Sequence, residues 1–246
     1  MKSIIAFGDS VLKGVIIDKE RSGDDSVRYT CLEDNFTNLC GKRLGLDVHN
    51  YGRFGGSTVD TGEKIMKRHL DAISKADFTL LEYGGNDCDH NWDEIAAAPN
   101  EAHKPKNDLR TFSLKYKELI DEVCRLGSSP IMLSLTPLDP ERYFNHFTCS
   151  MDKRQKNAVK EWLGGTYETI SSWHEMYNLQ VFKLAIALKV PIIDITSVFF
   201  SKKDYRDYLC EDGIHPNENG HRLIADAICD HLKTIKPARS LFSFSL

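Results

Sequence analysis

The sequence predicts an α/β protein, built as a three-layer α/β/α sandwich around a five-stranded parallel sheet. Short runs of aliphatic and β-branched residues alternate with longer stretches of helical period, which is the pattern of successive β-α units. With 246 residues and 41% hydrophobic content, the chain can bury one substantial core without disulfides or a structural metal. We therefore expect a single domain over residues 1–246, with a loosely held tail after about residue 237.

Five strands are expected, and each is a short run that is apolar on both of its faces. They are residues 3–7, 47–51, 78–83, 130–135 and 191–195. Runs of this kind are typical of parallel strands that helices cover on both sides. The pattern therefore predicts a sheet that is buried throughout.

Amphipathic helices are expected between the strands, several of them preceded by Ser, Thr, Asp or Asn as possible caps. They are residues 35–44, 58–73, 111–126, 166–189 and 219–235. Three connections are too long to be simple turns: residues 11–34, 88–109 and 136–165. Because long ordered loops often form lids or binding walls, we expect these segments to surround a ligand site at the carboxyl ends of the strands.

Composition and charge argue against several classes of partner. The net charge is -4, from 32 basic and 36 acidic residues without a long run of one sign, so neither nucleic acid nor a stable membrane association is indicated. The first apolar run, residues 3–7, is too short for a signal peptide or a membrane span. The seven cysteines form no C-x-x-C pair. We expect a cytoplasmic protein without a metal or another cofactor; the oligomeric state is left open.

Polar residues and a glycine follow the predicted strands at the points where they end. Ser10 follows the first strand, Gly55 the second and Asn86 the third, while Asp212 and His215 come after the fifth. Each of them alone is explained as a turn or a cap. Since the carboxyl ends of parallel strands meet at one edge, however, we expect these residues to converge on one crevice.

The residue types suit nucleophilic catalysis. A serine hydroxyl is a weak nucleophile until an imidazole takes its proton, and His215 is the natural base for Ser10. Asp212, three residues before this histidine, can reach the other ring nitrogen and fix its tautomer. The sequence therefore predicts a catalytic triad of Ser10, Asp212 and His215.

Four sequence blocks resemble those of the SGNH or GDSL hydrolases, a family named after the serine, glycine, asparagine and histidine of these blocks. They are Phe-Gly-Asp-Ser-Val at 7–11, Asn-Tyr-Gly-Arg-Phe-Gly-Gly-Ser at 50–57, Gly-Gly-Asn-Asp at 84–87 and Asp-Gly-Ile-His-Pro at 212–216. Val11 replaces the leucine of the family, and Gly55 stands five residues after Asn50, as the oxyanion glycine does in that family. The resemblance extends from residue 3 to about residue 227.

The resemblance implies the flavodoxin-like SGNH fold and the activity of a serine ester hydrolase. It also implies an oxyanion hole made of the backbone N–H groups of Ser10 and Gly55 and the side-chain amide of Asn86, with Gly56 as a weaker alternative to Gly55. Because the family includes carbohydrate acetylesterases, lysophospholipases, thioesterases and arylesterases, the fold does not decide the substrate. We expect a small-molecule ester with a short acyl group, such as an O-acetylated sugar or metabolite. The alternatives are a lysophospholipase or thioesterase and a non-catalytic binding module.

Two acidic residues adjoin the predicted site, Asp9 and Asp87. Their positions favour hydrogen bonds to loop backbone over a catalytic carboxylate pair. A metal site of Asp212, His215 and His221 is a further alternative, but it would leave Ser10, Gly55 and Asn86 unexplained.

Aromatic residues in or beside the two later connections are candidates for the wall of a substrate pocket. The four candidate substrate-binding residues are Trp92, Tyr143, Phe144 and Phe147, with Trp162 beside them. Packing of the loops themselves explains these rings equally well.

Overall fold

The computed structural model describes residues 2–22 and 27–234 and contains a central sheet of five parallel strands. Along the sheet the order is β4 (Asp47–Asn50), β1 (Ser3–Gly8), β5 (Phe78–Glu82), β6 (Ser129–Leu133) and β7 (Ile192–Ile193). The predicted fold class is confirmed. The expected loose tail after residue 237 lies outside the described residues.

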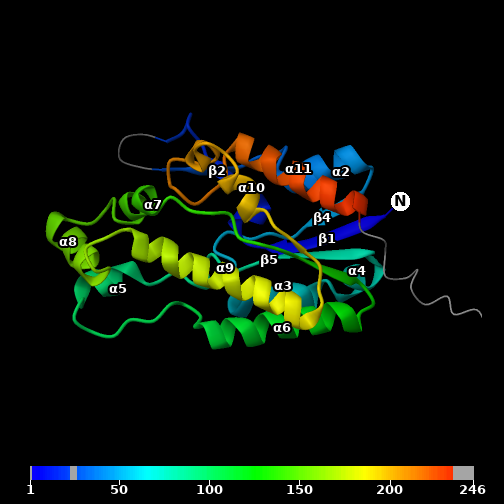
Figure 1. Cartoon of the computed structure of the whole chain (residues 1–246), viewed down its shortest axis with the longest axis horizontal. Helices are drawn as coiled ribbons and strands as arrows, with labels where there is room; N and C mark the ends of the chain where they lie inside the picture. Colours follow the sequence, from blue (N-terminus) through cyan, green and yellow to red (C-terminus); the bar gives the residue numbers. More distant parts are fainter. Residues whose placement is uncertain (1, 23–26, 235–246) are drawn as a thin grey trace, which may run out of the picture.

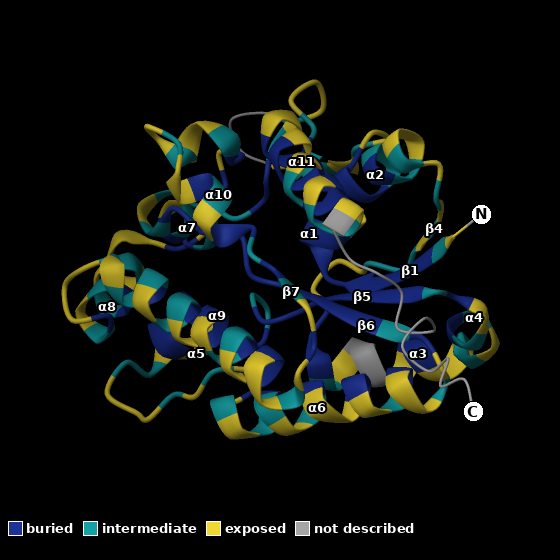
Figure 2. Ribbon diagram, turned by 45° about the vertical axis from the view of Figure 1, so that its right-hand side comes forward, coloured by how far each residue is buried: buried dark blue, intermediate teal, exposed yellow. Residues whose placement is uncertain are grey.

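Helices cover both faces of the sheet (Figure 1). One face carries α2 (Phe36–Leu44), α10 (Thr196–Phe200) and α11 (Glu218–Thr234). The other carries α3 (Glu63–Arg68), α4 (Leu70–Lys75), α6 (Leu109–Arg125) and α9 (Glu168–Leu188). Figure 2 shows the consequence: the central strands are buried, whereas α6 and α9 present exposed residues on their outer sides.

The alternation of side chains along β1 explains why its sequence is apolar on both faces. Ile5 and Phe7 belong to the core cluster under α6 and α9, whereas Ile4 and Ala6 belong to the cluster under α2 and α11. Successive residues of a strand point to opposite sides, so a strand between two helical layers needs apolar residues at every position.

The prediction that the sheet is buried throughout is wrong for β4. This strand is at the edge of the sheet and pairs with β1 alone, and its residues Asp47 and His49 are exposed. An edge strand has no neighbour on its outer side, which is why polar side chains are tolerated there.

The helix predicted over residues 58–73 is interrupted. A π-helical turn over Thr58–Gly62 leads into α3, and His69 separates α3 from α4 with a non-helical backbone (φ -124°, ψ 21°). The His69 ring packs on Tyr51, with ring centroids 3.8 Å apart. The spacing of apolar residues does not reveal such a break, because the same helical spacing continues in the next helix.

The three long connections contain short elements of their own. The first holds α1 (Ser10–Lys13) and an antiparallel hairpin of β2 (Val15–Ile17) and β3 (Tyr29–Cys31). The second holds α5 (Trp92–Ala97), and the third holds α7 (Pro140–Phe147) and α8 (Lys153–Trp162). A 3₁₀ turn, Tyr205–Tyr208, follows α10. Helices α5, α7 and α8 lie beyond the carboxyl ends of the strands (Figure 1) and share a third hydrophobic cluster.

Within residues 2–22 and 27–234, no helix combines the length and the apolar character that a membrane span requires.

Candidate active site

Ser10 is the first residue of α1, a one-turn helix that directly follows β1. Asp9 caps this helix, and its Oδ1 accepts a hydrogen bond of 2.7 Å from the backbone N–H of Val11. The loop after β4 packs closely on the same turn: a Cβ on Gly52 would lie 2.5 Å from the backbone nitrogen of Lys13. Only glycine permits this approach, so Gly52 helps to fix the backbone that carries Ser10.

Ser10, His215 and Asp212 are connected by two hydrogen bonds. His215 Nε2 lies 2.9 Å from Ser10 Oγ, and His215 Nδ1 lies 2.7 Å from Asp212 Oδ2. The other carboxylate oxygen of Asp212 accepts from the backbone N–H groups of Ile214 and His215, both at 3.1 Å. Because an ionised carboxylate only accepts, Nδ1 carries the ring proton and Nε2 presents its lone pair to Ser10.

All three residues are buried, with Asp212 1% and His215 2% exposed. Burial opposes the ionisation of Asp212, but the hydrogen bond and charge of His215 outweigh it, so that the pKa of Asp212 is lowered. The carboxylate therefore remains charged beside the imidazole at neutral pH.

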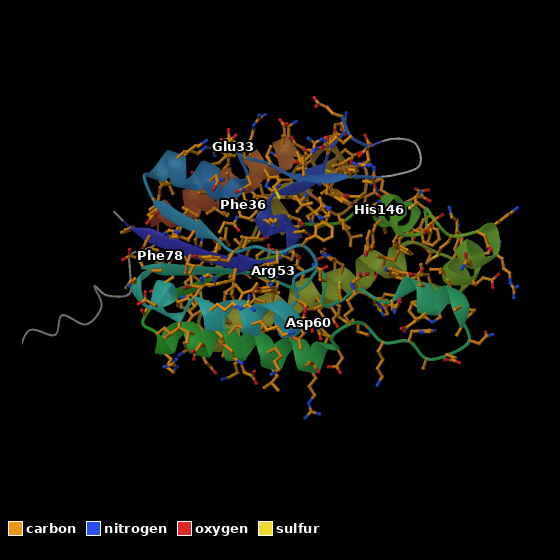
Figure 3. All side chains as sticks on the ribbon, turned by 180° about the vertical axis from the view of Figure 1, so that it is seen from behind. Glu33, Phe36, Arg53, Asp60, Phe78 and His146 are labelled. Atoms are coloured by element: carbon orange, nitrogen blue, oxygen red, sulfur yellow. The ribbon has the colours of Figure 1, made fainter. Side chains whose placement is uncertain are left out.

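Two aromatic rings cover the side of His215 that faces away from the core. The centroids of the Tyr29 and Phe54 rings lie 5.3 Å and 6.1 Å from that of His215, and Tyr29 Oη lies 2.9 Å from Nε2 of His146 on α7. Figure 3 labels His146, together with Arg53 from the loop after β4. Phe54 itself is 60% exposed, so this side of the site borders on solvent. None of Tyr29, Phe54 and His146 was predicted as a site residue. No local pattern indicates, for example, that Tyr29 of the β2–β3 hairpin lies against the loop of His215.

A cavity of about 80 Å³ is lined by Ser10 and His215. Of the four predicted pocket residues, Trp92 and Tyr143 line it. Phe144 and Phe147 are not among its lining residues: Phe144 is buried in the third hydrophobic cluster, and Phe147 stacks on Trp92 at 4.1 Å. These two rings support the wall from behind, as does the partly buried Trp162 of the same cluster.

The lining residues that were not predicted include His90 after β5, and Ile170, Trp173 and His174 on α9. The residues of α9 are spaced i, i+3 and i+4, which places them on one face of the helix. That spacing was present in the sequence. Its meaning depends on where the first turn of α9 lies relative to the strand ends, which the sequence does not report.

The predicted oxyanion residues occupy different positions. Asn86 lines the cavity with Ser10, and its Nδ2 donates a 2.9 Å hydrogen bond to Asp9 Oδ2. An amide nitrogen carries two hydrogens, so one N–H remains for a ligand. Gly55 is exposed, with φ +67°, and is not among the lining residues; its neighbour Phe54 brings this loop to the open side of His215. Gly56 is buried, and its N–H is bonded to the carbonyl of Arg53.

A pair of buried carboxyl groups lies beneath the cavity. Asp9 is 3% and Glu82 2% exposed, and the backbone N–H of Asp9 donates to Glu82 Oε2 at 3.2 Å. Burial raises the pKa of both groups, and the charge of Asp9 raises that of Glu82 further. Neither pairs with a lysine or arginine in the described part of the chain. Two adjacent buried carboxyls without a cation cannot both ionise, so the pair keeps a proton, which we assign to Glu82.

Asp87, the second acid beside the predicted site, binds the start of the helical segment after β4. It accepts from the Thr58 backbone N–H at 3.1 Å and from Asn107 Nδ2 at 2.9 Å. Burial raises its pKa to about 6 against the opposing effect of these hydrogen bonds. Both acids therefore accept hydrogen bonds from backbone N–H groups.

A model of the GDSL-like lipase/acylhydrolase family matches residues 6–223. The chain belongs to this family. The matched range includes every residue of the Ser10–His215–Asp212 chain and the segments that hold it. One relative by sequence is the uncharacterized protein YpmR of Bacillus subtilis, which is 24% identical over 238 residues. The alignment covers 94% of this chain and 81% of the relative.

Solved structures share the fold of this GDSL-family chain. The lipase/acylhydrolase from Enterococcus faecalis has a TM-score of 0.63 and 18% identity, with 96% of this chain and 98% of that chain covered. A carbohydrate acetylesterase from Sinorhizobium meliloti has a TM-score of 0.62 and 17% identity, covering 95% and 99%. The aryl esterase of M. smegmatis has a TM-score of 0.61 and 16% identity, covering 96% and 100%. At these identities the likeness concerns the fold.

The third histidine of the alternative metal site has a different environment in this GDSL-family chain. Nδ1 of His221 accepts from the backbone N–H of Phe36 at 3.4 Å, and the two rings stack. Burial lowers the pKa of His221 to about 3. The His221 ring therefore binds and packs against the first residue of α2. Within the described residues it forms no metal-binding group with Asp212 and His215.

Proposed function

We propose that this protein is a serine ester hydrolase that cleaves short-acyl carboxylic esters through an acyl-serine intermediate. The observation that carries the proposal is the hydrogen-bonded chain from Asp212 through His215 to Ser10, buried at the side of a small cavity. The membership in a hydrolase family agrees with it. A binding module would have no need of a base whose lone pair is directed at a serine hydroxyl.

The reaction follows from these atoms. Ser10 Oγ attacks the acyl carbon while its proton passes to His215 Nε2, and Asp212 stabilises the imidazolium that forms. The bond to the alcohol oxygen then breaks, and Nε2 returns the proton to the leaving alcohol. Water attacks the acyl-serine with His215 as base again, which releases the carboxylic acid and restores the serine.

The negative oxygen of each tetrahedral intermediate needs donors that are fixed in advance. We assign the Ser10 backbone N–H and the free N–H of the Asn86 side chain to this task. We propose the backbone N–H of Gly55 as the third donor to this oxygen. Because Gly55 stands on the exposed loop beside Phe54, this donor approaches from the open side of the site.

The size of the cavity supports a short acyl group. Its volume of about 80 Å³ is roughly half that of a protein cavity that holds benzene, about 150 Å³. Acyl groups from acetate to butyrate suit this space. The alcohol then faces the open side, where the Tyr29 and Phe54 rings suit the flat face of a sugar or another small ring. We propose O-acetylated sugars or small metabolites as the substrate class, in line with the carbohydrate acetylesterase among the structural relatives.

Two measurements test the proposal. A fluorophosphonate probe should label the wild-type protein at Ser10, and nitrophenyl esters should be cleaved with kcat/KM highest from acetate to butyrate and much lower at decanoate. Ser10→Ala should abolish both signals, whereas Ser74→Ala, which changes a partly exposed serine of α4, should change neither. Turnover above a few per cent in Ser10→Ala would disprove the nucleophile. A maximum at long chains would instead favour a lysophospholipase or thioesterase.

A further inference from the structure

Two histidines that the proposed mechanism does not use line the same cavity as Ser10. His90 is 6% and His174 7% exposed, and each has a buried Nδ1 without a hydrogen-bond partner. Buried polar atoms are normally paired, and an unpaired one costs free energy. A polar group of a ligand in the cavity would offset this cost.

His90 stands in a box of aromatic rings. The centroids of the Trp173, Trp162 and Trp92 rings lie 4.7, 5.4 and 5.5 Å from that of the imidazole. Burial among these rings lowers the pKa of His90, against a smaller opposing effect of Asp89. The ring is therefore neutral at pH 7 and offers one N–H donor and one lone pair.

His174 reaches the cavity from the first turns of α9 and adjoins Trp173, which lines the same wall. The carboxylate oxygen Oε1 of Glu175 lies 3.8 Å from its Nδ1, too far for a hydrogen bond. The cavity thus has two imidazoles in its wall, with Trp92 and Trp173 beside them.

We propose that His90 and His174 form a hydrogen-bonding subsite for an uncharged hydroxyl group on the acyl chain of the substrate. The inference rests on the proposed function, because it takes the cavity as the acyl side of an ester hydrolase. The acyl group stays on Ser10 after the alcohol has left, so it suits the cavity, whereas the departing alcohol needs the open side at Phe54.

The other walls favour a hydroxyl over the competing groups. The carboxylates of Asp9 and Asp89 also line the cavity, and they would repel a second carboxylate on the acyl chain. A plain alkyl chain offers no hydrogen-bonding group and would leave the Nδ1 atoms of both imidazoles unpaired. A hydroxyl both donates and accepts, which matches a neutral imidazole.

The test compares two nitrophenyl esters whose acyl chains differ by one hydroxyl group, butyrate and 3-hydroxybutyrate. We call the kcat/KM value on 3-hydroxybutyrate divided by that on butyrate the hydroxyacyl ratio. Dividing the hydroxyacyl ratio of a variant by that of the wild type cancels the intrinsic reactivity of the two esters. His90→Phe and His174→Phe keep a ring against the tryptophans but remove the nitrogens. We expect the hydroxyacyl ratio to fall about tenfold in each variant, whatever the change in the rate on butyrate itself.

A matched control is His103→Phe. His103 packs on Trp162 at 5.7 Å, but its Nε2 is bonded to the Ala98 carbonyl and it is not among the lining residues. The hydroxyacyl ratio should be unchanged in this variant. His90→Gln, which keeps a donor and an acceptor, should retain more of the ratio than His90→Phe, and this comparison holds even where the larger ring disturbs the wall.

The subsite is refuted if both phenylalanine variants keep the wild-type ratio, whether their activity on the two esters is unchanged or falls equally. Failure of the proposed function has another signature: the wild type would then cleave neither ester faster than Ser10→Ala. The two outcomes are therefore separated within one set of measurements.

Discussion

Replacement of Asp212 by asparagine tests the triad most sharply, because the carboxylate has two different tasks. One oxygen binds His215 Nδ1, and the other accepts from two backbone N–H groups, those of Ile214 and His215. An asparagine that keeps its carbonyl on the backbone donors must direct its NH₂ group at Nδ1. The ring proton then moves to Nε2, which can no longer accept the proton of Ser10.

The size of the effect follows from the alternative orientation of the amide. If the asparagine turns its carbonyl to Nδ1, the tautomer is restored, but two buried backbone N–H groups face an NH₂ group without an acceptor. Each such group costs about 1–3 kcal/mol, so restoring the tautomer costs about 2–6 kcal/mol. We therefore expect a loss of kcat of about 30-fold to about 2 × 10⁴-fold.

The assay is the hydrolysis of nitrophenyl acetate per folded molecule by Asp212→Asn, Asp212→Ala and His215→Ala. Asparagine, although closer in shape to aspartate, should be at least as harmful as alanine, which leaves the tautomer free. Both should lose less than His215→Ala, which removes the proton acceptor itself. Activity of Asp212→Asn within a few-fold of the wild type would refute the tautomer reasoning. A greater loss than in His215→Ala would refute the assigned roles.

Two other substitutions separate catalysis from stability. Asn86→Ala should lower kcat by about 10²- to 10³-fold, as expected for one oxyanion donor. Asn107→Ala, which removes a hydrogen bond to Asp87, should lower stability and leave the rate per folded molecule unchanged. Equal rate losses in the two variants would contradict the assignment of Asn86. Asp87→Asn tests the buried carboxyl: its pKa of about 6, against an ordinary 3.8, means that its stabilising contribution is full below pH 3.8 and is lost as the pH rises through 6. Urea unfolding should show the free energy of unfolding of Asp87→Asn rising relative to wild type by about 2 kcal/mol from pH 4 to pH 7, and a constant difference would disprove the buried titration.

The elements that were predictable from sequence are those whose signal is local. A buried parallel strand is a short apolar run, and the residue at its carboxyl end is known once the run is known, which is why Ser10 and Asn86 are brought to one cavity as expected. The pairing of Asp212 with His215 is local too, since three residues separate them. That these strand ends meet in one crevice could be inferred only after the parallel-sheet fold itself had been predicted.

The parts that were not predicted depend on contacts between segments far apart in the chain. Tyr29 reaches His215 across 186 positions, and no periodicity in either segment reports that contact. The helices in the long connections did have signals. Asp152 and Gln155 form a capping box at the start of α8, and Asp139-Pro140 is a typical cap and first position for α7. Phe144 and Phe147 were assigned to the pocket by composition alone, which cannot distinguish the front of a wall from its back.

The buried acids next to Ser10 and Asn86 clarify how this site is built. Burial of Asp9, Glu82 and Asp87 costs stability, because each has a raised pKa at neutral pH. One oxygen of Asp9, however, caps α1, the helix that begins at Ser10, and the other binds the Asn86 amide. Turning that amide over would place its oxygen against the Asp9 carboxylate, so the interaction selects the orientation in which Asn86 presents an N–H to the cavity. The proton on Glu82 allows Asp9 to keep its charge. In the proposed mechanism, Asp9 therefore orients Asn86, the proposed oxyanion donor, and has no role in proton transfer.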